Sequence, residues 1–329
     1  MTRPAPALSD KVGGHRPTIS VVVATLGRST LLPGLVDAVL SDPDASELIV
    51  VVDGDDPASI STLTDLERSY PRLISFAVPH GGHLRTLDAG VARARSDVIL
   101  LLDDDVLPRP GLVGGHVRRH AERTGLVVMG WMPVLVRQGS RPGVSTLLYR
   151  QEYASHCLAI ERGERVVLDA LWGGNVSLSR ADCLRVGLRS DRFDVHYHSD
   201  RDLGLRLSEA GLDGIFDKSL GAVHLHVRSN RDFLMDALRQ GVGLSRLHQV
   251  HLDRLGPFCP AMLASDLPLP LRMAVRWVGS SRWAKPLSSV VLGAGTLLGY
   301  VGWRWPETQS AKFARRCLQW QGAVQKRDP

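Results

Sequence analysis

Cysteine is scarce in this sequence of 329 residues, and its four cysteines are widely separated. No C-x-x-C pair occurs, so neither a zinc site nor a disulfide framework is expected. Residues 1–17 are rich in proline and alanine and lack the apolar run, roughly 7–15 residues long, of a secretory signal. These absences predict a flexible N-terminal arm and a reduced, cytoplasmic compartment.

Acidic residues are scarce at the other end of the chain. The segment Pro268–Pro329 contains 10 basic and 2 acidic residues, whereas the first 267 residues contain 30 basic and 32 acidic ones. The net charge of +6 therefore resides in the C-terminal segment. A nucleic-acid-binding fold needs Lys and Arg clustered on the fold itself, so no nucleic-acid partner is expected. With 44% apolar residues the chain also has enough material for a core, which excludes wholesale disorder.

Between residues 18 and 106 the sequence alternates between apolar, β-branched runs and helical stretches. Four runs are expected to be strands: Ile19–Ala24, Leu48–Val52, Leu73–Val78 and Val98–Leu102. Three stretches with helical spacing lie between them: Leu31–Leu40, Ile60–Ser69 and Leu84–Ala94. Apolar strands joined by helices are typical of a parallel sheet buried on both faces, so the expected fold class is a doubly wound α/β unit. Such sheets bind their ligands beyond the carboxyl ends of the strands.

Acidic residues occur at those carboxyl ends. Asp53 follows the second predicted strand, and Asp103, Asp104 and Asp105 follow the fourth. Adjacent carboxylates repel one another and gain raised pKa values unless a cation lies among them. In an extended or turn conformation Asp103 and Asp105 would face one side and Asp104 the other, and the first two could hold Mg²⁺ or Mn²⁺ together with phosphate oxygens. A turn that caps a helix is the alternative interpretation of the triplet.

The segment from residue 127 to residue 227 is less regular. It contains three short strand-like runs: Val127–Met129, Val134–Val136 and Val166–Leu168. Within it, Trp172–Asn175 joins an aromatic residue to two glycines, which can adopt φ > 0 or let a ligand approach the backbone. Farther along, Phe233–Leu247 is expected to be a helix that breaks at Gly241 and Gly243.

Titratable residues gather near the end of this segment. Asp200 and Asp202 precede a helix expected over Leu203–Ala210, where acids could simply complement the helix dipole. His224 and His226 share one face of a predicted strand, either as satisfied core residues or as metal ligands. The set as a whole, more than any one member, indicates a functional site.

Five segments in a fixed order carry a resemblance to a known family. They are Ile19–Thr25, Leu48–Gly54, Gly90–Asp105, Gly173–Arg180 and Asp200–Gly211. From about residue 18 to about residue 247, the chain resembles the family 2 glycosyltransferases. The resemblance implies a GT-A fold, which is Rossmann-like with a mostly parallel central sheet and helices on both faces, plus a C-terminal helical tail. It divides the chain into a catalytic domain over 18–250, with nucleotide-binding (18–106) and acceptor (107–250) halves, and a basic region over 251–329.

The same resemblance implies roles for individual residues. Asp200 would be the catalytic base, and Asp103, Asp105 and His226 would hold Mn²⁺ or Mg²⁺, with His224 as the alternative to His226. Residues from several loops would bind the nucleotide-sugar donor: Ala24, Thr25, Asp53, Arg85, Asp104, Gly173, Gly174, Asn175, Arg228 and Arg231.

The sequence departs from the family pattern at three places. Ser199 replaces the acid that usually precedes the catalytic base. Thr86–Asp88 stands where the family has Ala-Arg-Asn, which makes Arg85 the candidate for the missing arginine. The Gln-x-x-Arg-Trp element of processive synthases is absent from the expected region, which favours transfer of a single sugar.

The implied function is metal-dependent, inverting transfer of one sugar from a nucleotide-sugar to a hydroxyl acceptor of unspecified class, with a UDP-sugar favoured as donor. Asp200 would take the proton of the acceptor hydroxyl as attack begins. Two other functions stay open. One is a nucleotidyltransferase on a similar α/β core, although the loop Thr25–Arg28 has only one glycine. The other is a non-catalytic sugar-nucleotide-binding or membrane-scaffold protein.

Residues 286–303 form a long uncharged stretch of 18 residues, flanked by tryptophans and basic residues. Its length barely reaches the roughly 17–25 residues of a membrane span. Gly295 and Gly299 have the spacing of a close helix–helix contact. Three interpretations stay open: a buried helical hairpin, a segment lying on an anionic membrane surface, and a span. The expected location is the cytoplasm, with peripheral attachment to the inner face of the plasma membrane as the alternative.

Overall fold

The computed structural model describes residues 16–136, 141–225, 228–265 and 267–325. These residues form two compact units. Unit 1 takes its described residues from 1–132, 163–188 and 206–224, and unit 2 takes them from 133–162, 189–205 and 225–329. Unit 2 therefore includes helices from the predicted acceptor half as well as the C-terminal region.

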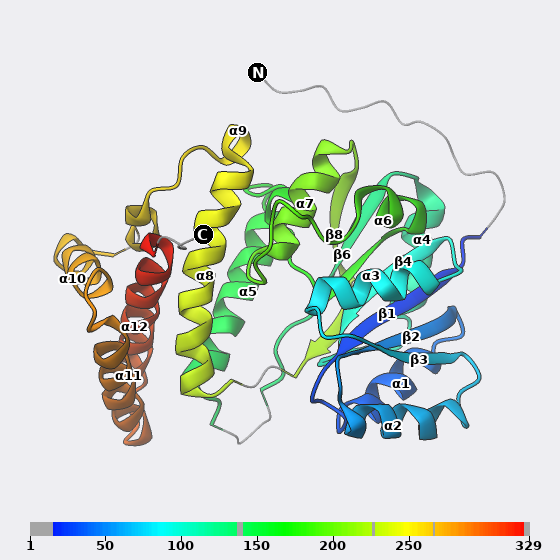
Figure 1. Cartoon of the computed structure of the whole chain (residues 1–329), viewed down its shortest axis with the longest axis horizontal. Helices are drawn as coiled ribbons and strands as arrows, with labels where there is room; N and C mark the ends of the chain where they lie inside the picture. Colours follow the sequence, from blue (N-terminus) through cyan, green and yellow to red (C-terminus); the bar gives the residue numbers. More distant parts are fainter. Residues whose placement is uncertain (1–15, 137–140, 226–227, 266, 326–329) are drawn as a thin grey trace. The chain divides into compact units, whose positions relative to one another are not determined.

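Unit 1 is built on an eight-stranded sheet with the strand order β3-β2-β1-β4-β7-β6-β8-β5 (Figure 1). The strands are β1 (Ile19–Thr25), β2 (Ala45–Asp53), β3 (Leu73–Val78), β4 (Val98–Asp103), β5 (Val106–Pro108), β6 (Leu126–Trp131), β7 (Asn175–Ser179) and β8 (Asp213–His224). Strands β3, β2, β1 and β4 are parallel, as are β6 and β8, whereas β7 and β5 run antiparallel to their neighbours. The predicted α/β class with a mostly parallel sheet is confirmed.

Strands β1, β2 and β4 are largely buried because helices cover both faces of the sheet, whereas β3 at the sheet edge is mostly half-buried. Every residue of β1 is buried, as the apolar, β-branched sequence of this strand predicts. The helices of unit 1 are α1 (Leu32–Leu40), α2 (Pro57–Glu67), α3 (His83–Arg93), α4 (Leu112–Glu122) and α6 (Arg180–Val186). Figure 1 shows α1 and α2 on one side of strands β1 to β3 and α3 on the other. Gly90 lets α3 approach the sheet, since a Cβ there would lie 2.4 Å from Val22 Cγ1.

Unit 2 is helical. Its main helices are α5 (Val144–Glu161), α8 (Asn230–Val250), α9 (Leu252–Leu255), α10 (Leu269–Gly279), α11 (Ala284–Tyr300) and α12 (Arg304–Val324), and α7 (Ser199–Glu209) begins in this unit. Leu148, Phe233, Leu292 and Leu318, from four different helices, share one buried cluster. The apolar residues of the C-terminal region thus share one core with α5 and α8.

Helix α8 is continuous, so the predicted break at Gly241 and Gly243 is wrong. Both glycines serve close packing instead. A Cβ at Gly241 would lie 1.9 Å from Gln319 O on α12, and one at Gly243 would lie 2.4 Å from Tyr197 O. Tertiary contact, which a local helix propensity does not include, explains why the helix tolerates them.

The irregular middle segment contains less strand and more helix than its sequence suggests. Val127–Met129 does lie in β6, but no described strand runs through Val134–Val136 or Val166–Leu168. Residues Leu168–Ala170 form a short 3₁₀ helix instead. The long helix α5 was not predicted, because its apolar side chains are spread around the helix rather than gathered on one face.

The uncharged stretch lies mainly in α11, which packs antiparallel to α12 as a helical hairpin. Ser288 Oγ donates to Ala314 O, and a Cβ at Gly295 would lie 2.5 Å from Ser310 Cβ. The Gly295 and Gly299 pair therefore serves a close helix contact within the protein. No helix among the described residues is long and apolar enough to cross a membrane.

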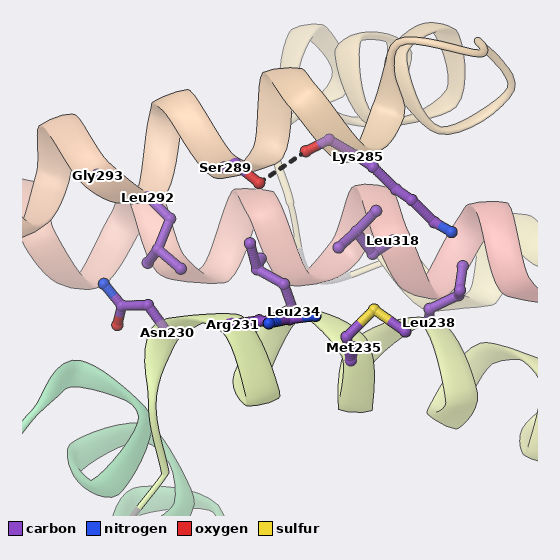
Figure 2. Close-up of a pocket in the computed structure, with 10 residues that line it drawn as sticks. All are labelled: Asn230, Arg231, Leu234, Met235, Leu238, Lys285, Ser289, Leu292, Gly293 and Leu318. Carbon is purple, nitrogen blue, oxygen red and sulfur yellow. Dashed lines mark hydrogen bonds between the residues drawn. The ribbon is translucent and has the colours of Figure 1, made fainter.

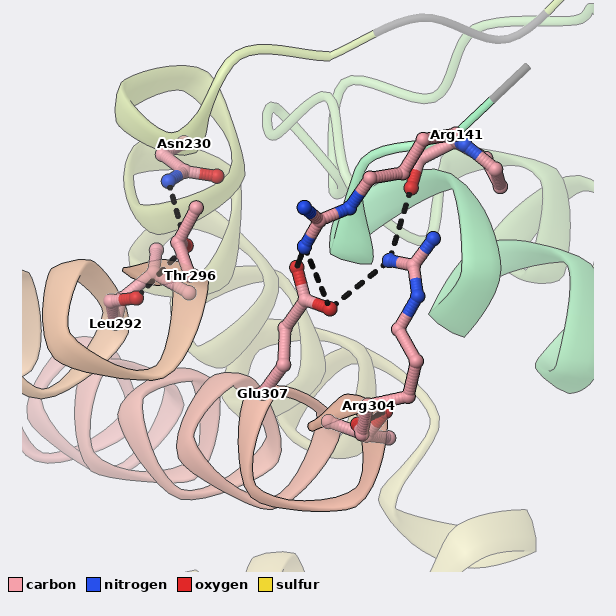
Figure 3. Close-up of polar contacts among 8 residues, drawn as sticks. Arg141, Asn230, Leu292, Thr296, Arg304 and Glu307 are labelled. Carbon is pink, nitrogen blue, oxygen red and sulfur yellow. Dashed lines mark hydrogen bonds and ion pairs between the residues drawn. The ribbon is translucent and has the colours of Figure 1, made fainter. Parts of the chain in front are cut away.

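A buried carboxylate fixes the turn between α11 and α12. Only 4% of the Glu307 side chain is exposed, and it accepts hydrogen bonds from Arg304 Nη1 at 2.9 Å and Arg141 Nη2 at 3.4 Å (Figure 3). The Arg141 guanidinium also lies over the Tyr300 ring, 4.1 Å from its centre. Two cations thus neutralise one buried acid and tie the segment before α5 to this turn.

Candidate active site

Parallel strands bring the predicted nucleotide-side residues to one edge of unit 1. Strand β1 lies between β2 and β4, with Ala24 opposite both Val51 and Asp103. The carboxyl ends of the three strands therefore place Thr25, Asp53 and the acidic triplet on the same edge. This is the edge at which α/β sheets bind ligands.

A compact set of polar side chains, called here the edge cluster, surrounds Arg28. Arg28 Nη1 lies 2.6 Å from Asp104 Oδ1 and 2.6 Å from Asp105 Oδ2. Thr25 Oγ1 donates to Asp104 Oδ2 at 2.8 Å. His224 Nε2 lies 3.2 Å from Asp105 Oδ1 and completes the cluster.

The predicted alternation of the triplet does not hold. Asp104 and Asp105 converge on the same guanidinium nitrogen of Arg28, whereas Asp103 takes other neighbours. The reason is local: Asp104 and Asp105 form a turn between β4 and β5, so the period of two of an extended strand ends at Asp103.

Burial and charge act in opposite directions on the acids of the edge cluster. Burial raises the pKa of Asp104, although Arg28 and the Thr25 hydroxyl partly offset the effect. Burial also acts to raise the pKa of Asp105, but the hydrogen bond from His224 and the charge of Arg28 outweigh it and hold that pKa far below its usual range. Despite its own burial, Arg28 has a raised pKa because it faces both carboxylates.

Of the two histidines considered as metal ligands, His224 reaches the edge cluster. It is the last residue of β8, and the antiparallel pairing of Val106 with His224 sets it beside the triplet. Its side chain and that of Asp105 are 7% and 9% exposed. His226 lies outside the described residues.

Asp103 has the more open carboxylate, with 33% of its side chain exposed. Its Oδ1 lies 3.6 Å from His83 Nε2 at the start of α3. Its backbone N–H donates to Gly174 O at 3.3 Å. Gly174 has a φ of +92°, and a Cβ on it would lie 2.6 Å from Asp103 Oδ2. Glycine at this position therefore leaves room for the carboxylate, with Gly173 next to it in the same loop.

Asn175 lies inside the sheet and uses both ends of its amide there. Its Nδ2 donates to Leu220 O at 3.1 Å, and its Oδ1 lies 3.0 Å from His116 Nε2. His116 Nδ1 and His120 Nε2 both contact Ser177 Oγ, at 2.7 and 2.8 Å. This buried network fixes β7 and thereby the loop that carries Gly174.

Asp53 organises the loop that precedes α3. Its carboxylate accepts hydrogen bonds from the backbone N–H groups of Gly81 at 2.8 Å and Gly82 at 3.1 Å. His80 Nδ1 lies 3.1 Å from the same carboxylate. The exposed Arg85 lies close to this loop, because a Cβ at Gly81 would lie 2.4 Å from its Cδ. The structure thus brings Asp53 and Arg85 to one loop.

Asp200 lies in unit 2, in the first turn of α7. Its Oδ1 accepts the backbone N–H of Arg201 at 2.9 Å, and the side chain is half-buried. Just before it, His198 has a φ of +67°, the one positive φ outside glycine among the described residues. Such backbone strain clusters at functional sites. Burial lowers the pKa of His198 to about 4.

Asp202 and Arg228 have partners within unit 2, whereas Arg231 faces a pocket of that unit. Asp202 is buried against His251, with 2.8 Å between Oδ1 and Nε2, so it joins α7 to the end of α8. Arg228 Nε lies 3.6 Å from Asp236 Oδ2. Arg231 lies in the first turn of α8, on the rim of a pocket described below.

The carboxylates at this edge suit a hard divalent cation whose remaining ligands come from a bound phosphate. Within the described ranges, no group of three or more His, Cys, Asp or Glu is arranged to hold a metal ion. Two carboxylates together with phosphate oxygens nevertheless make the oxygen-rich set that Mg²⁺ and Mn²⁺ prefer. The low pKa of Asp105 keeps this carboxylate ionised.

Sequence reasoning missed Arg28 and His83 as members of this edge. A signal for Arg28 was present, because it is a basic residue in the loop that follows a fully buried strand. His83 lies at the start of a helix and carried no comparable signal.

Comparisons with known proteins identify a family and related chains. The family model described as "Glycosyltransferase like family 2" matches residues 16–242. A curated relative, "Uncharacterized glycosyltransferase YfnE" of Bacillus subtilis (strain 168), is 22% identical over an alignment of 266 residues, and the match covers 66% of this chain and 68% of the relative.

Two solved structures share the fold. The mannosyltransferase PcManGT from Pyrobaculum calidifontis, in complex with GDP-Man and Mn²⁺, matches with a TM-score of 0.57 and 18% identity, covering 94% of this chain and 89% of that one. GalNAc-T7 with UDP, GalNAc and Mn²⁺ matches with a TM-score of 0.51 and 15% identity, covering 77% of this chain and 52% of that one. The fold is GT-A, as the sequence resemblance implied.

Proposed function

This chain belongs to the family 2 glycosyltransferases, and from that premise we propose that it moves one sugar from a nucleotide-sugar donor to a hydroxyl acceptor. The observation that carries the proposal is the edge cluster beyond β1 and β4, where Thr25 and Arg28 meet the acidic triplet. A nucleotide bound at this edge would lie where open α/β sheets bind their ligands.

We assign the donor-binding residues by loop. Ala24, Thr25, Asp53 and Arg85 belong to the nucleotide side, with Asp104 held by Thr25 and Arg28. Gly173 and Gly174 form the loop that we assign to the donor sugar. Asn175 uses both ends of its amide within the sheet, so we assign it to holding this loop. Arg228 and Arg231 remain candidates for contact with the diphosphate.

Divalent metal dependence is part of the proposal. Both structural neighbours were solved with Mn²⁺. Asp103 and Asp105 would hold Mn²⁺ or Mg²⁺, with His224 favoured over His226 because His224 already contacts Asp105. When bound, the metal would offset the negative charge that develops on the leaving diphosphate.

Asp200 is the proposed catalytic base. An alcohol is a poor nucleophile at neutral pH, so the carboxylate of Asp200 would accept its proton as attack begins. Attack by the activated hydroxyl opposite the leaving diphosphate would invert the anomeric carbon. The position of Asp200 at the start of α7, next to the strained His198, supports a functional role.

The base assignment is tested by Asp200→Asn, which keeps the size of the side chain. We expect turnover to fall by roughly 10²- to 10⁴-fold while donor binding is retained, because general base catalysis contributes about that much. Asp191→Asn is the matched control, since 90% of the Asp191 side chain is exposed. Near-normal turnover of Asp200→Asn with unchanged donor binding would exclude Asp200 as the base.

The donor and the metal are tested together with a thermal-shift panel of UDP-, GDP- and dTDP-sugars. We expect a UDP-sugar to raise the unfolding temperature most, and only in the presence of Mn²⁺ or Mg²⁺. Addition of a chelator should abolish both the shift and donor hydrolysis. A shift of equal size with and without the metal would contradict the metal assignment. A larger shift with a GDP-sugar would show that a GDP-sugar, not a UDP-sugar, is the donor.

We also propose that the C-terminal helices rest on an anionic membrane surface, which would place the protein peripherally at a cytoplasmic membrane face. Along α11, Val290 and Leu297 are 68% and 69% exposed, and Trp277, Trp283 and Trp305 nearby are exposed as well. Residues 267–306 contain five basic residues and no acidic one. Exposed aromatic and apolar groups among positive charges suit an interface with anionic lipid.

Membrane contact is tested by sedimentation of the full chain with vesicles of phosphatidylglycerol or of phosphatidylcholine. We expect binding to the anionic vesicles only, and at least a fivefold loss in the double variant Val290→Ser and Leu297→Ser. The control is Val166→Ser with Leu184→Ser, which changes two exposed apolar side chains of unit 1. Equal sedimentation with both vesicle types would contradict the proposal.

A further inference from the structure

Unit 2 contains a pocket of about 420 Å³ between α8, α11 and α12 (Figure 2). The apolar part of its lining comes from Leu234, Met235, Leu238, Leu292 and Leu318. Its volume lies within the range of roughly 300–1,000 Å³ of small-molecule sites. It is distinct from the edge cluster, which lies entirely in unit 1.

The pocket forms because α8 and α11 both pack against α12 but contact each other only at one end. Helices α8 and α11 both pack along α12, but they meet each other over a much shorter length. Asn230 Nδ2 donates to Thr296 Oγ1 at 3.2 Å, which ties α8 to α11 at one end (Figure 3). Beyond this tie an elongated gap is left between them, with Leu318 of α12 at its base.

The shape of the pocket suits a hydrocarbon chain. Lys285 and Gly293 lie eight residues apart on α11, which corresponds to about 12 Å along the helix axis. Met235, which fills irregular spaces easily, lines the same side as Leu234 and Leu238. Gly293 leaves the wall open, since no atom lies within 4 Å of a Cβ built on it.

The charge on the rim suits an anion. Arg231 and Lys285 line the pocket, and no acidic residue does. Within the part of the chain that the structure describes, neither cation takes part in an ion pair. Figure 2 shows the Lys285 ammonium at the Leu238 end of the pocket, away from Asn230. A ligand with an apolar chain and an anionic head matches both features.

We propose that this α8–α11 pocket binds the hydrocarbon chain of one anionic lipid drawn from a membrane surface, with Lys285 at its head group. The membrane contact proposed above supplies the source of the lipid, but binding in the pocket does not depend on sugar transfer. A single lipid held in this way would anchor unit 2 at the surface.

The test uses soluble, single-chain probes below their micelle concentration, measured by calorimetry on the full chain. We expect dodecyl phosphate to bind with a stoichiometry of one and at least fivefold more tightly than dodecylphosphocholine, which has no net charge. Shortening the chain should weaken binding about three- to fourfold for each methylene that leaves the pocket.

Gly293→Phe is the decisive variant. Residue 293 lines the pocket and a Cβ there meets no atom within 4 Å, so we expect the ring to occupy the pocket, and the change removes a residue that disfavours helix. We expect at least a tenfold loss of dodecyl phosphate binding with an unchanged unfolding temperature. Ala294→Phe, which puts the same ring on the adjacent exposed position, is the matched control and should bind like the unmodified chain.

Lys285→Gln tests the head group. We expect it to lower the affinity for dodecyl phosphate towards that for dodecylphosphocholine, whereas Lys312→Gln should leave both affinities unchanged. Unaltered binding in Gly293→Phe, or equal affinity for the two probes, would overturn the proposal. If dodecyl phosphate carried a sugar after incubation with the protein and a nucleotide-sugar, the pocket would bind an acceptor, and the proposal that its ligand is a membrane anchor would be overturned. Donor hydrolysis, measured separately, reports on the proposed function alone.

Discussion

Gly174 sets the space available to the Asp103 carboxylate. Its φ of +92° is unfavourable for any residue with a side chain. In addition, a Cβ built on it would lie 2.6 Å from Asp103 Oδ2, so a side chain there would also clash with the carboxylate. We expect Gly174→Ala to lower donor hydrolysis at least tenfold, because the Asp103 carboxylate must move from its place at the end of β4. Gly163→Ala is the control.

Gly163 has a φ of +71° but no atom within 4 Å of a built Cβ, so it shares only the backbone penalty. Both variants should lose about 1 kcal/mol of stability from that backbone term, measured by urea unfolding. If the two variants retained the same activity, the contact between Gly174 and Asp103 would have no functional importance.

Arg28 is the cation on which the buried acids of the edge cluster depend. Its removal leaves Asp104 without its ion pair, and Asp105 keeps only His224. We expect Arg28→Gln to lower the free energy of unfolding by about 3 kcal/mol, as for other buried pairs that lose one partner. Arg68→Gln, which breaks an exposed pair with Asp65, should cost less than about 1 kcal/mol. Equal costs for the two variants would contradict this ranking.

At the scale of single residues, the sequence predicted which acids reach the edge but not how they pair. Asp53 and Asp103 follow buried parallel strands, and such strands end at a common edge, so their placement there was predictable. The pairing of Asp104 and Asp105 with Arg28 depends on the turn between β4 and β5. A pattern of residue types contains no information about that turn.

At the scale of secondary structure, the first four strands of unit 1 were predictable from sequence, whereas the helices of unit 2 were predicted less well. Strands such as β1 and β4 were predictable because their burial on both faces demands an unbroken apolar run. Helix α5 was missed because its apolar residues do not form a single stripe. The predicted break in α8 was wrong because its glycines are required by neighbours distant in sequence, such as Gln319.

Glycines in the helices of unit 2 can therefore be sorted by what lies next to them. A Cβ at Gly241 would lie 1.9 Å from a backbone oxygen of α12, whereas one at Gly293 meets nothing within 4 Å. We expect Gly241→Ala to destabilise the chain by about 3 kcal/mol through overpacking. Gly293→Ala should stabilise it by up to about 1 kcal/mol through helix propensity. Thermal unfolding of both variants measures the difference, and a stabilised Gly241→Ala would show that α8 and α12 separate easily.

At the scale of the whole molecule, the acids of the proposed site and the excess of basic residues lie in different units. The acids near the sheet edge have cationic or hydroxyl partners within unit 1, as Asp104 and Asp105 do. The excess positive charge lies in the C-terminal helices of unit 2, where residues 267–306 contain no acid at all. Three histidines distributed over both units, the buried His116 and His120 and the half-buried His198, make the stability depend on pH.

Burial lowers the pKa of His116 to about 3 and those of His120 and His198 to about 4. An unfolded histidine titrates near its ordinary value of about 6.5, so below that pH the unfolded chain binds protons that the folded chain does not. The free energy of unfolding therefore falls as the pH falls from 6.5 towards 4. Each histidine should contribute roughly 1.5 kcal/mol of loss between pH 6.5 and pH 5.

Carboxylates do not obscure this window. The pKa values of Asp56 and Asp217 are lowered, so these groups change the stability only below about pH 4. The raised pKa of Asp104 acts in the opposite direction to the histidines, but it is one group against three. Urea unfolding from pH 5 to pH 7 measures the slope. We expect His120→Gln to reduce the slope by the contribution of one histidine, about a third of that expected from the three. A flat profile in the unmodified chain would mean that the buried imidazoles gain protons without unfolding.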